Sequence, residues 1–156
     1  MIRRAAPDDA EAIARVQLRT WQHAYADIVD PQLLAEHTVA SRTDRWRELL
    51  SGDEATTLVL DVEGTIAGFA TVVPGELRAL YVDPPAQGAG AGSGLLLAAQ
   101  DALRAGGHRD AVLWVFEANA HARAFYERHG WSAEDPPVVN DDRWAPELRY
   151  HRELTP

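Results

Sequence analysis

The chain has 156 residues, and its 24 Asp and Glu outnumber its 15 Arg and Lys, so its formal charge at neutral pH is −9. This length predicts a single domain, residues 1–156, that buries a core of its own. The charge argues against a nucleic-acid partner, because phosphate backbones are bound by clustered cations. The longest apolar stretch, residues 111–116, is far shorter than the roughly 20 residues of a membrane span, and no apolar signal core follows Met1. We therefore expect a cytoplasmic protein that does not insert into membranes.

Cys and Lys do not occur in the sequence, and this excludes several kinds of chemistry. Without Cys there is no disulfide, no thiolate zinc site and no cysteine acyl-enzyme. Without Lys there is no Schiff base and no phosphate-binding P-loop lysine. The six His residues show no spacing that carboxylates would complete into a metal site, so we predict that no metal is bound.

Hydrophobic periodicity predicts the elements of the first half of the chain. Helical spacing gives way to alternation near Thr57, and Glu63-Gly64 reads as the tight turn of a hairpin. We expect two helical regions, 10–25 and 31–50, the second with a break before Thr43. Three strands follow, at 57–62, 66–73 and 76–82.

The second half begins with a glycine-rich loop and continues with alternating helices and strands. We expect a helix at 93–105, a buried strand at 111–116, a short helix at 119–129 and two final strands at 131–133 and 147–154. The order of elements along the chain predicts a mixed α/β sheet.

The loop at residues 83–92 connects a predicted strand to a predicted helix. Its small side chains would let main-chain N–H groups approach an anion, and the helix that starts at about Ser93 would add its dipole. A dinucleotide fingerprint would need a further Gly at position 93 or 95, and a P-loop would need Lys, so neither motif fits. Taken alone, the loop is equally compatible with a tight strand-to-helix turn.

Two motifs together resemble the GNAT superfamily of acyl-CoA-dependent N-acetyltransferases. The first is Gln-x-x-Gly-x-Gly, formed by Gln87, Gly90 and Gly92 directly after a strand. The second is residues 119–131, which begin with Asn, carry Phe-Tyr and end in Gly-Trp. The order of elements is similar over nearly the whole chain, whereas the first helices and final strands match only in pattern. The resemblance implies a mixed, mostly antiparallel sheet with a splayed central strand pair and helices on both faces.

The resemblance also implies where acetyl-CoA would bind. Main-chain amides of the glycine loop, with the Ser93 hydroxyl, would hold the pyrophosphate, and the strand end would pair with the pantetheine arm and the thioester carbonyl. Asn119 would bond the pantetheine region, although it also reads as a plain helix N-cap. The implied cofactor-binding residues are Leu80, Tyr81, Val82, Gln87, Gly88, Ala89, Gly90, Ala91, Gly92, Ser93, Asn119 and Tyr126.

Two residues match catalytic positions of the superfamily. Tyr126 matches the tyrosine that meets the CoA sulfur, where a phenol can act as general acid. Because Phe125 and Tyr126 point in different directions on one helix, at least one of them should be core. Glu76 stands eleven residues before Gln87, where some relatives carry a base carboxylate and others use a chain of waters. The absence of Cys favours direct transfer in a ternary complex over an acyl-enzyme.

The implied acceptor site lies between the first helices and the last strands. Candidate residues there are Trp21, His23 and Tyr25 on one side and the acidic loop with Glu134, Asp135, Asp141 and Asp142 on the other. The loop could attract a cationic amine, or it is simply solvated, and the pattern favours Trp21 and Tyr25 as core residues over pocket walls.

The function we expect is an acetyl-CoA-dependent N-acetyltransferase that acts on a primary amine of a small molecule, a peptide or a protein. The alternatives are a non-catalytic acyl-CoA-binding module, transfer of another acyl group, and transfer to a hydroxyl. The identity of the acceptor stays open, and so does a homodimer formed through an exposed sheet edge.

Overall fold

The computed structural model describes residues 1–141 and 144–154. The strands are β1 (Ile2–Arg4), β2 (Thr56–Val62), β3 (Thr65–Val73), β4 (Glu76–Val82), β5 (Asp110–Phe116), β6 (Ser132–Ala133), β7 (Val139–Asn140) and β8 (Glu147–Glu153). The helices are α1 (Ala10–Ala24), α2 (Pro31–Ala35), α3 (Val39–Ser51), α4 (Ala91–Ala105) and α5 (Ala120–Arg128), with short 3-10 turns at Pro7–Asp9 and Pro84–Ala86. No helix in this described part of the chain combines the length and the hydropathy needed to span a membrane.

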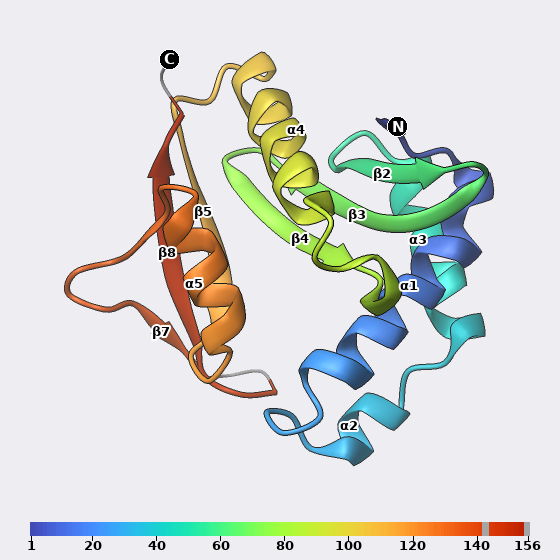
Figure 1. Cartoon of the computed structure of the whole chain (residues 1–156), viewed down its shortest axis with the longest axis horizontal. Helices are drawn as coiled ribbons and strands as arrows, with labels where there is room; N and C mark the ends of the chain where they lie inside the picture. The colour runs from blue at the N-terminus through green and yellow to red at the C-terminus, as the bar shows by residue number, and fades with distance from the viewer. Residues whose placement is uncertain (142–143, 155–156) are drawn as a thin grey trace.

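The strands form one mixed sheet in the order β1-β2-β3-β4-β5-β8-β6, with β7 paired to β8 (Figure 1). All neighbouring strands are antiparallel except β4 and β5, which are parallel. A parallel pair needs a crossover, and α4 supplies it. The mixed, mostly antiparallel sheet that the sequence predicts is therefore confirmed.

The pairing of β4 and β5 is confined to one end of the two strands. Their register contains the single pair Glu76 and Val112, and the Val112 N–H donates to the Gly75 carbonyl at 3.0 Å. On the other edge of β4 the register to β3 shifts, which leaves Arg78 as a bulge residue. Beyond the pair of Glu76 and Val112, β4 and β5 diverge (Figure 1), so the expected splay of the central strand pair is confirmed.

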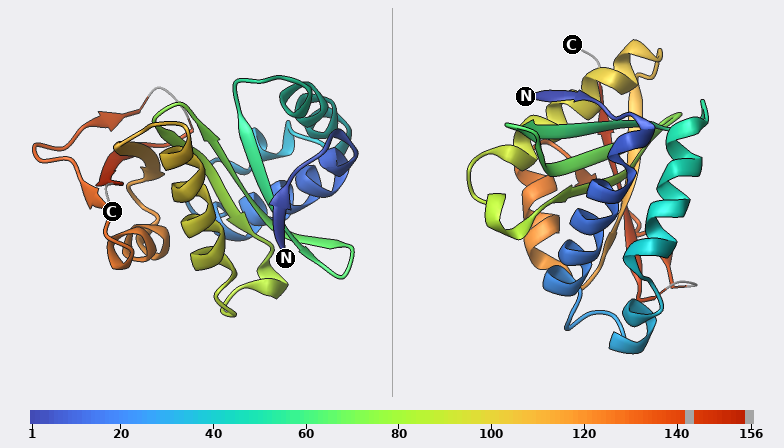
Figure 2. Two further views of the ribbon diagram at one scale, coloured as in Figure 1. Left: turned by 90° about the horizontal axis from the view of Figure 1, so that it is seen from above. Right: turned by 90° about the vertical axis from the view of Figure 1, so that its right-hand side faces the viewer.

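Helices cover both faces of the sheet (Figure 2). On one face α1 and α3 pack against β2 and β3 through a cluster that includes Ile13, Trp46 and Phe69. On the opposite face α4 packs through Leu95 and Leu96 against the sheet, and α5 lies beside it. The gap between β4 and β5 thus separates two halves of the sheet, each with a helical cover.

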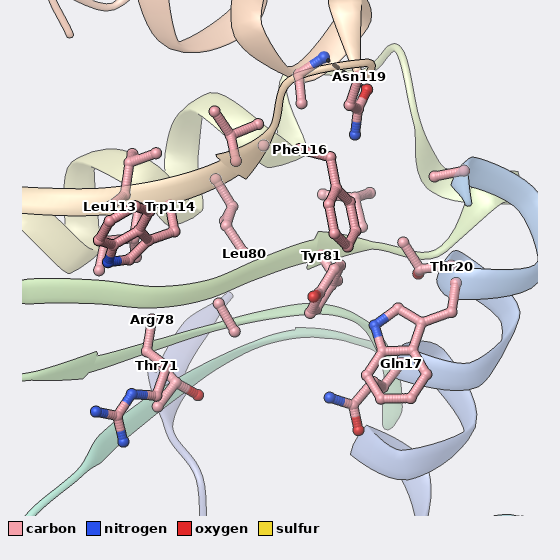
Figure 3. Close-up of a pocket in the computed structure, with 18 of the residues that line it drawn as sticks. Gln17, Thr20, Thr71, Arg78, Leu80, Tyr81, Leu113, Trp114, Phe116 and Asn119 are labelled. Atoms are coloured by element: carbon pink, nitrogen blue, oxygen red, sulfur yellow. Dashed lines mark hydrogen bonds between the residues drawn. The ribbon is translucent and has the colours of Figure 1, made fainter. Parts of the chain in front are cut away.

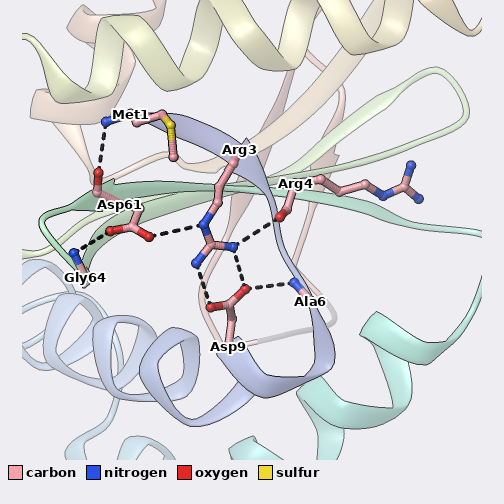
Figure 4. Close-up of polar contacts among 7 residues, drawn as sticks. All are labelled: Met1, Arg3, Arg4, Ala6, Asp9, Asp61 and Gly64. Carbon is pink, nitrogen blue, oxygen red and sulfur yellow. Dashed lines mark hydrogen bonds and ion pairs between the residues drawn. The ribbon is translucent and has the colours of Figure 1, made fainter.

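The N-terminal strand β1 was not expected from the sequence, because three residues are too few to show alternation. It pairs with β2 and is fixed by Arg3, whose guanidinium donates to both carboxylate oxygens of Asp9 at 2.8 and 2.9 Å (Figure 4). The same side chain donates to Asp61 at 3.1 Å. Arg3 holds the pKa of the Asp9 carboxyl below its ordinary value. A long-range ion-pair network, rather than local propensity, therefore defines this strand.

The other differences between expectation and structure are small. The strand β7 also went unpredicted, since it has only two residues and depends on β8 for its pairing. The helix α4 begins at Ala91 and not at about Ser93, because Gly90 adopts the left-handed conformation and serves as the N-cap. The predicted strands and helices elsewhere match the structure to within a few residues.

Candidate active site

A cleft of about 1170 Å³ opens where β4 and β5 separate. Its walls come from both faces of the sheet: the loop before α4 and helix α5 on one side, and α1, α3 and Trp144 on the other. Leu80 and Tyr81 of β4 lie across this gap from Leu113 and Phe116 of β5 (Figure 3). The splay of the sheet therefore creates a continuous passage between the two helical layers.

The end of β4 directs main-chain groups into the cleft. The Asp83 N–H donates to the Ala67 carbonyl of the β3 side at 2.8 Å. Because hydrogen-bonded residues alternate along an antiparallel strand, the main-chain groups of Leu80 and Val82 face away from β3, toward the cleft. The Val82 carbonyl accepts a hydrogen bond from the Gln87 side-chain amide at 2.9 Å. An extended ligand could add to this strand edge through the remaining groups.

The glycine loop presents further main-chain donors at one end of the cleft. Gly88 and Gly90 have φ values of 88° and 81°, a conformation that side chains disfavour, and nothing lies within 4 Å of where their Cβ atoms would stand. The first intrahelical hydrogen bond of α4 runs from Gly94 N–H to Gly90 at 3.1 Å. The amides of residues 91–93 are therefore left without a helical acceptor, which is the arrangement that binds anions at helix N-termini.

A histidine that the sequence did not single out lies against this loop. His129 Nδ1 is 2.7 Å from the Phe125 carbonyl, which only accepts, so the ring proton of neutral His129 is on Nδ1. Its Nε2 then accepts from the Ser93 hydroxyl at 2.9 Å. The Ser93 hydroxyl, which the resemblance assigns to the pyrophosphate, is thus held by α5.

Asn119 begins α5 and also lines the cleft. Its side-chain oxygen accepts from the Ala122 N–H at 3.2 Å, so it caps the helix. The amide nitrogen of the same side chain is not used by this contact. The helix-capping role therefore leaves two donors available for a ligand.

Three phenols from three different elements line the middle of the cleft. The hydroxyls of Tyr25 and Tyr81 are 3.2 Å apart, and the Tyr25 ring packs edge-on against Phe116 with centroids 4.8 Å apart. Burial raises the pKa of Tyr126 above its ordinary value, and it does the same for Tyr25. Both phenols therefore keep their protons at neutral pH.

Glu76 lies at the other end of β4, where the strands still pair, and it also lines the cleft. Its carboxylate is 3.9 Å from the guanidinium of Arg78. Glu76 and Tyr126 thus lie on opposite walls of one cleft, on β4 and α5.

The side of the cleft formed by α1, α3 and Trp144, where the acceptor was expected, is rich in aromatic rings. The rings of Trp21, His37 and Trp144 lie with centroids 5.0 to 5.3 Å apart. Trp21 is 7% exposed, so it is both part of the core and part of the cleft wall. Tyr25 and His23 line the same region.

Three of the four acidic residues expected near the acceptor, Glu134, Asp135 and Asp141, do not line the cleft. Glu134 pairs with Arg149 at 3.3 Å. Neither Asp135 nor Asp141 lines the cleft, and Asp142 lies outside the described residues. In residues 1–141 and 144–154, no group of three or more His, Asp or Glu side chains is placed to hold a metal ion. The expectation that no metal is bound stays a prediction.

The model of the acetyltransferase (GNAT) family matches residues 10–131, which is most of the chain and includes the strand edge, the glycine loop and α5. The chain belongs to the GNAT family. It is an acetyl-CoA-dependent N-acetyltransferase, and the non-catalytic alternative is set aside by this membership.

Individual relatives of this GNAT enzyme agree with the assignment. The chain is 28% identical to the uncharacterized N-acetyltransferase YuaI of Bacillus subtilis, over 92% of this chain and 83% of that protein. Its fold matches the PaiA N-acetyltransferase of Thermoplasma acidophilum in complex with coenzyme A, with a TM-score of 0.80, 20% identity and 98% of each chain covered. It also matches YncA of Salmonella typhimurium with acetyl-CoA, with a TM-score of 0.74, 20% identity, and 100% and 94% of the two chains covered.

The residues of this GNAT chain fit the diphosphate and the extended arm of CoA. The loop offers main-chain donors with open space in front of Gly88 and Gly90. A Cβ at Gly92 would come within 3.3 Å of the Phe125 ring, so the glycine lets α4 and α5 approach closely. The strand edge at Leu80 offers a hydrogen-bonding partner for an amide-containing arm.

Five of the cleft residues that were not predicted from the sequence of this GNAT enzyme bear on its chemistry. They are Gln17, Arg42, His129, Trp144 and Glu147. Only His129 had a local signal, since it follows Phe125 by one helical turn within the second motif. The others meet in the cleft through tertiary packing, which spacing along the chain does not show.

Proposed function

We propose that this enzyme transfers the acetyl group of acetyl-CoA directly to the primary amine of a small molecule, peptide or protein, with both substrates bound at once. The observation that carries the proposal is the cleft between β4 and β5. Main-chain donors line its α4 and α5 side, and a separate set of side chains lines its α1 and α3 side. Two substrates can therefore enter from opposite faces of the sheet and meet in the gap.

The proposed binding of acetyl-CoA follows from the directions of the donors. Amides from Gly88 to Gly92 hold the diphosphate, and the Ser93 hydroxyl joins them by turning its proton from His129 Nε2 to a phosphate oxygen. Leu80 and Val82 pair with the pantetheine arm, and the Leu80 N–H polarises the thioester carbonyl. Asn119 donates to the arm from the opposite side of the cleft.

The proposed chemistry forms a C–N bond and breaks the C–S bond. The ammonium must first lose a proton, which goes to Glu76 or to a water held there. Tyr126 gives its proton to the departing sulfur, so that CoA leaves as a thiol, and the second proton that the new amide nitrogen loses restores Tyr126. Because burial raises its pKa, Tyr126 is protonated when the thioester binds, and the same burial disfavours a free thiolate, so the sulfur takes the proton as the C–S bond breaks.

The variant Tyr126→Phe tests the acid. We expect kcat to fall about a hundredfold, as general acids contribute roughly 10²–10⁴-fold. The Kd of CoA, measured by calorimetry, should stay within about twofold, because the ring remains. Tyr150→Phe removes a phenol outside the cleft and should leave kcat nearly unchanged. If Tyr126→Phe keeps full turnover, Tyr126 is not the acid.

Initial rates test the order of events. Direct transfer in a ternary complex predicts intersecting double-reciprocal lines when acetyl-CoA and a suitable amine are varied together. Parallel lines would instead indicate a covalent acetyl-enzyme, for which this chain offers no Cys.

A further inference from the structure

The inference concerns Arg42, a half-buried cation on α3 that lines the acceptor side of the cleft. Among the described residues, no carboxylate forms an ion pair with it, and the charged neighbour that most affects its pKa is another cation, Arg45. Partial burial lowers the pKa of Arg42. A guanidinium that is partly removed from water normally has an anionic partner. Arg42 is therefore suited to bind an anionic group of a ligand.

The side chain is held in one orientation by a buried glutamine. Gln17 is 5% exposed, and its side-chain oxygen accepts from Arg42 Nε at 3.0 Å and from Trp46 Nε1 at 2.9 Å. The guanidinium also lies 5.4 Å from the centre of the Trp21 ring. These contacts use Nε and one face of the group. Its two terminal nitrogens, which form the fork that matches a carboxylate, have no partner among the described residues.

The position of Arg42 separates it from the coenzyme. It lies on α3, which covers one face of the sheet, whereas the glycine loop and α5 lie on the other face (Figure 2). Arg42 lines the same cleft as Tyr81, which lies at the strand end that faces the thioester in the proposed complex. An anion bound there would belong to the acceptor and not to CoA.

We propose that the acceptor is an amine that also carries a carboxylate, as amino acids do, and that Arg42 binds the carboxylate end-on. This inference rests on the proposed function, because it assigns the second substrate of the same site. With the carboxylate on the terminal nitrogens of Arg42, the amine of the same molecule points toward Tyr81 and Leu80. The rings of Trp21, His37 and Trp144 then enclose an apolar side chain of the acceptor. Arg42 acts as a specificity-determining residue, and it takes no part in proton transfer.

The test compares three acceptors that differ in the carboxylate: phenylalanine, phenylalanine amide and phenethylamine. A second series, glycine, β-alanine and 4-aminobutyrate, keeps the carboxylate and varies its distance from the amine. In the wild type we expect kcat/KM to be at least about tenfold higher for the acid than for its amide or amine, since charge-assisted hydrogen bonds of this kind are worth a factor of about 10 to 100. Arg42→Gln should reduce this preference to less than about threefold. Arg42→Lys, which keeps the charge but loses the fork, should give an intermediate preference.

Arg47→Gln is the matched control, because it removes an exposed arginine from the same helix, outside the cleft. It should leave the preference unchanged. Binding supplies a readout that does not need turnover: in the presence of CoA, the calorimetric Kd of N-acetylphenylalanine should be at least about tenfold lower than that of its amide, and Arg42→Gln should abolish the difference.

The outcomes distinguish the two proposals. Equal use of acids and amines by the wild type, or a preference that survives Arg42→Gln, overturns the inference while the transfer reaction stands. If no amine is acetylated, direct transfer to an amine fails together with the assignment of the acceptor, and the binding measurement decides the remaining claim, that Arg42 recognises a carboxylate. Binding of the amide as tightly as the acid then overturns it.

Discussion

The two walls of the cleft are built in different ways. The coenzyme wall consists mainly of main-chain groups from two short segments, the strand and loop at residues 80–93 and the start of α5. The acceptor wall consists of side chains from α1, α3 and the segment before β8. Gln17 and Arg42 there are 25 residues apart in sequence, and Trp21 packs on Trp144 from the far end of the chain.

This difference determines how each wall responds to substitution. A main-chain site depends on backbone conformation, so it tolerates changes of side chain until one alters φ and ψ. A side-chain site depends on a few directed groups, and each of them can be exchanged without moving the backbone. The same sheet can therefore keep one coenzyme while the opposite wall changes its acceptor.

Among the substitutions that test the difference between the two walls, Gly90→Val is expected to have the largest effect. A β-branched residue in its left-handed conformation is strained, and Gly90→Val should displace the amides at the start of α4. We expect the Kd of CoA to rise by at least about tenfold, because several amide contacts to the diphosphate are lost together.

Gly107→Val is the matched control for Gly90→Val. Gly107 has a φ of 89°, open space at its Cβ and a place beyond the other end of α4. Both variants should lose a similar free energy of unfolding, about 1 to 3 kcal/mol, in urea titrations. Only Gly90→Val should weaken CoA binding. Equal weakening by the two variants would mean that general destabilisation, and not the amide cradle, sets the affinity.

A smaller effect is expected from Gln17→Glu on the acceptor wall. A carboxylate in place of the Gln17 amide still accepts from Trp46 and Arg42, but it now neutralises the guanidinium. The kcat/KM for carboxylate-bearing acceptors should fall by about three- to tenfold, while CoA affinity stays the same. Gln22→Glu adds the same charge at an exposed position of α1 and should change neither value. A loss of CoA affinity in Gln17→Glu would show that the two walls are not independent.

The segments proposed to form the coenzyme wall could largely be placed from the sequence, because their conformation has local determinants. Gly90 marks a left-handed residue at a helix start, and its spacing from Gln87 sets the loop between β4 and α4. The order of elements predicted the mixed sheet, and the resemblance predicted its splay. Each of the two motifs lies within fewer than twenty residues, whereas the order of elements is read along the whole chain.

The acceptor wall could not be predicted in the same way. Arg42 on an exposed-looking helix is indistinguishable in sequence from Arg45 or Arg47 beside it. Only the packing of α3 on α1 turns Arg42 toward Gln17 and leaves Arg47 in solvent. The short strand β1 escaped prediction for the same reason, since its partner strand β2 lies more than fifty residues away.

The smallest effect concerns the phenols where the two walls meet, and it is measured as the pH dependence of the free energy of unfolding. Because the chain has neither Lys nor Cys, its four Tyr are the side chains that titrate between about pH 9 and 11. Burial raises the pKa of Tyr126 in the folded protein, whereas an unfolded phenol ionises near pH 10. Above that pH the unfolded state binds fewer protons than the folded state, so the free energy of unfolding must fall as pH rises, by up to about 1.4 kcal/mol per pH unit for each such residue. Urea titrations from pH 8 to pH 11 should show this fall in the wild type and a shallower one in Tyr126→Phe, with Tyr25 accounting for part of the remainder. Parallel curves for the two proteins would mean that Tyr126 ionises as freely in the cleft as in water, and the phenol would then lose its proton at high pH instead of keeping it for the sulfur.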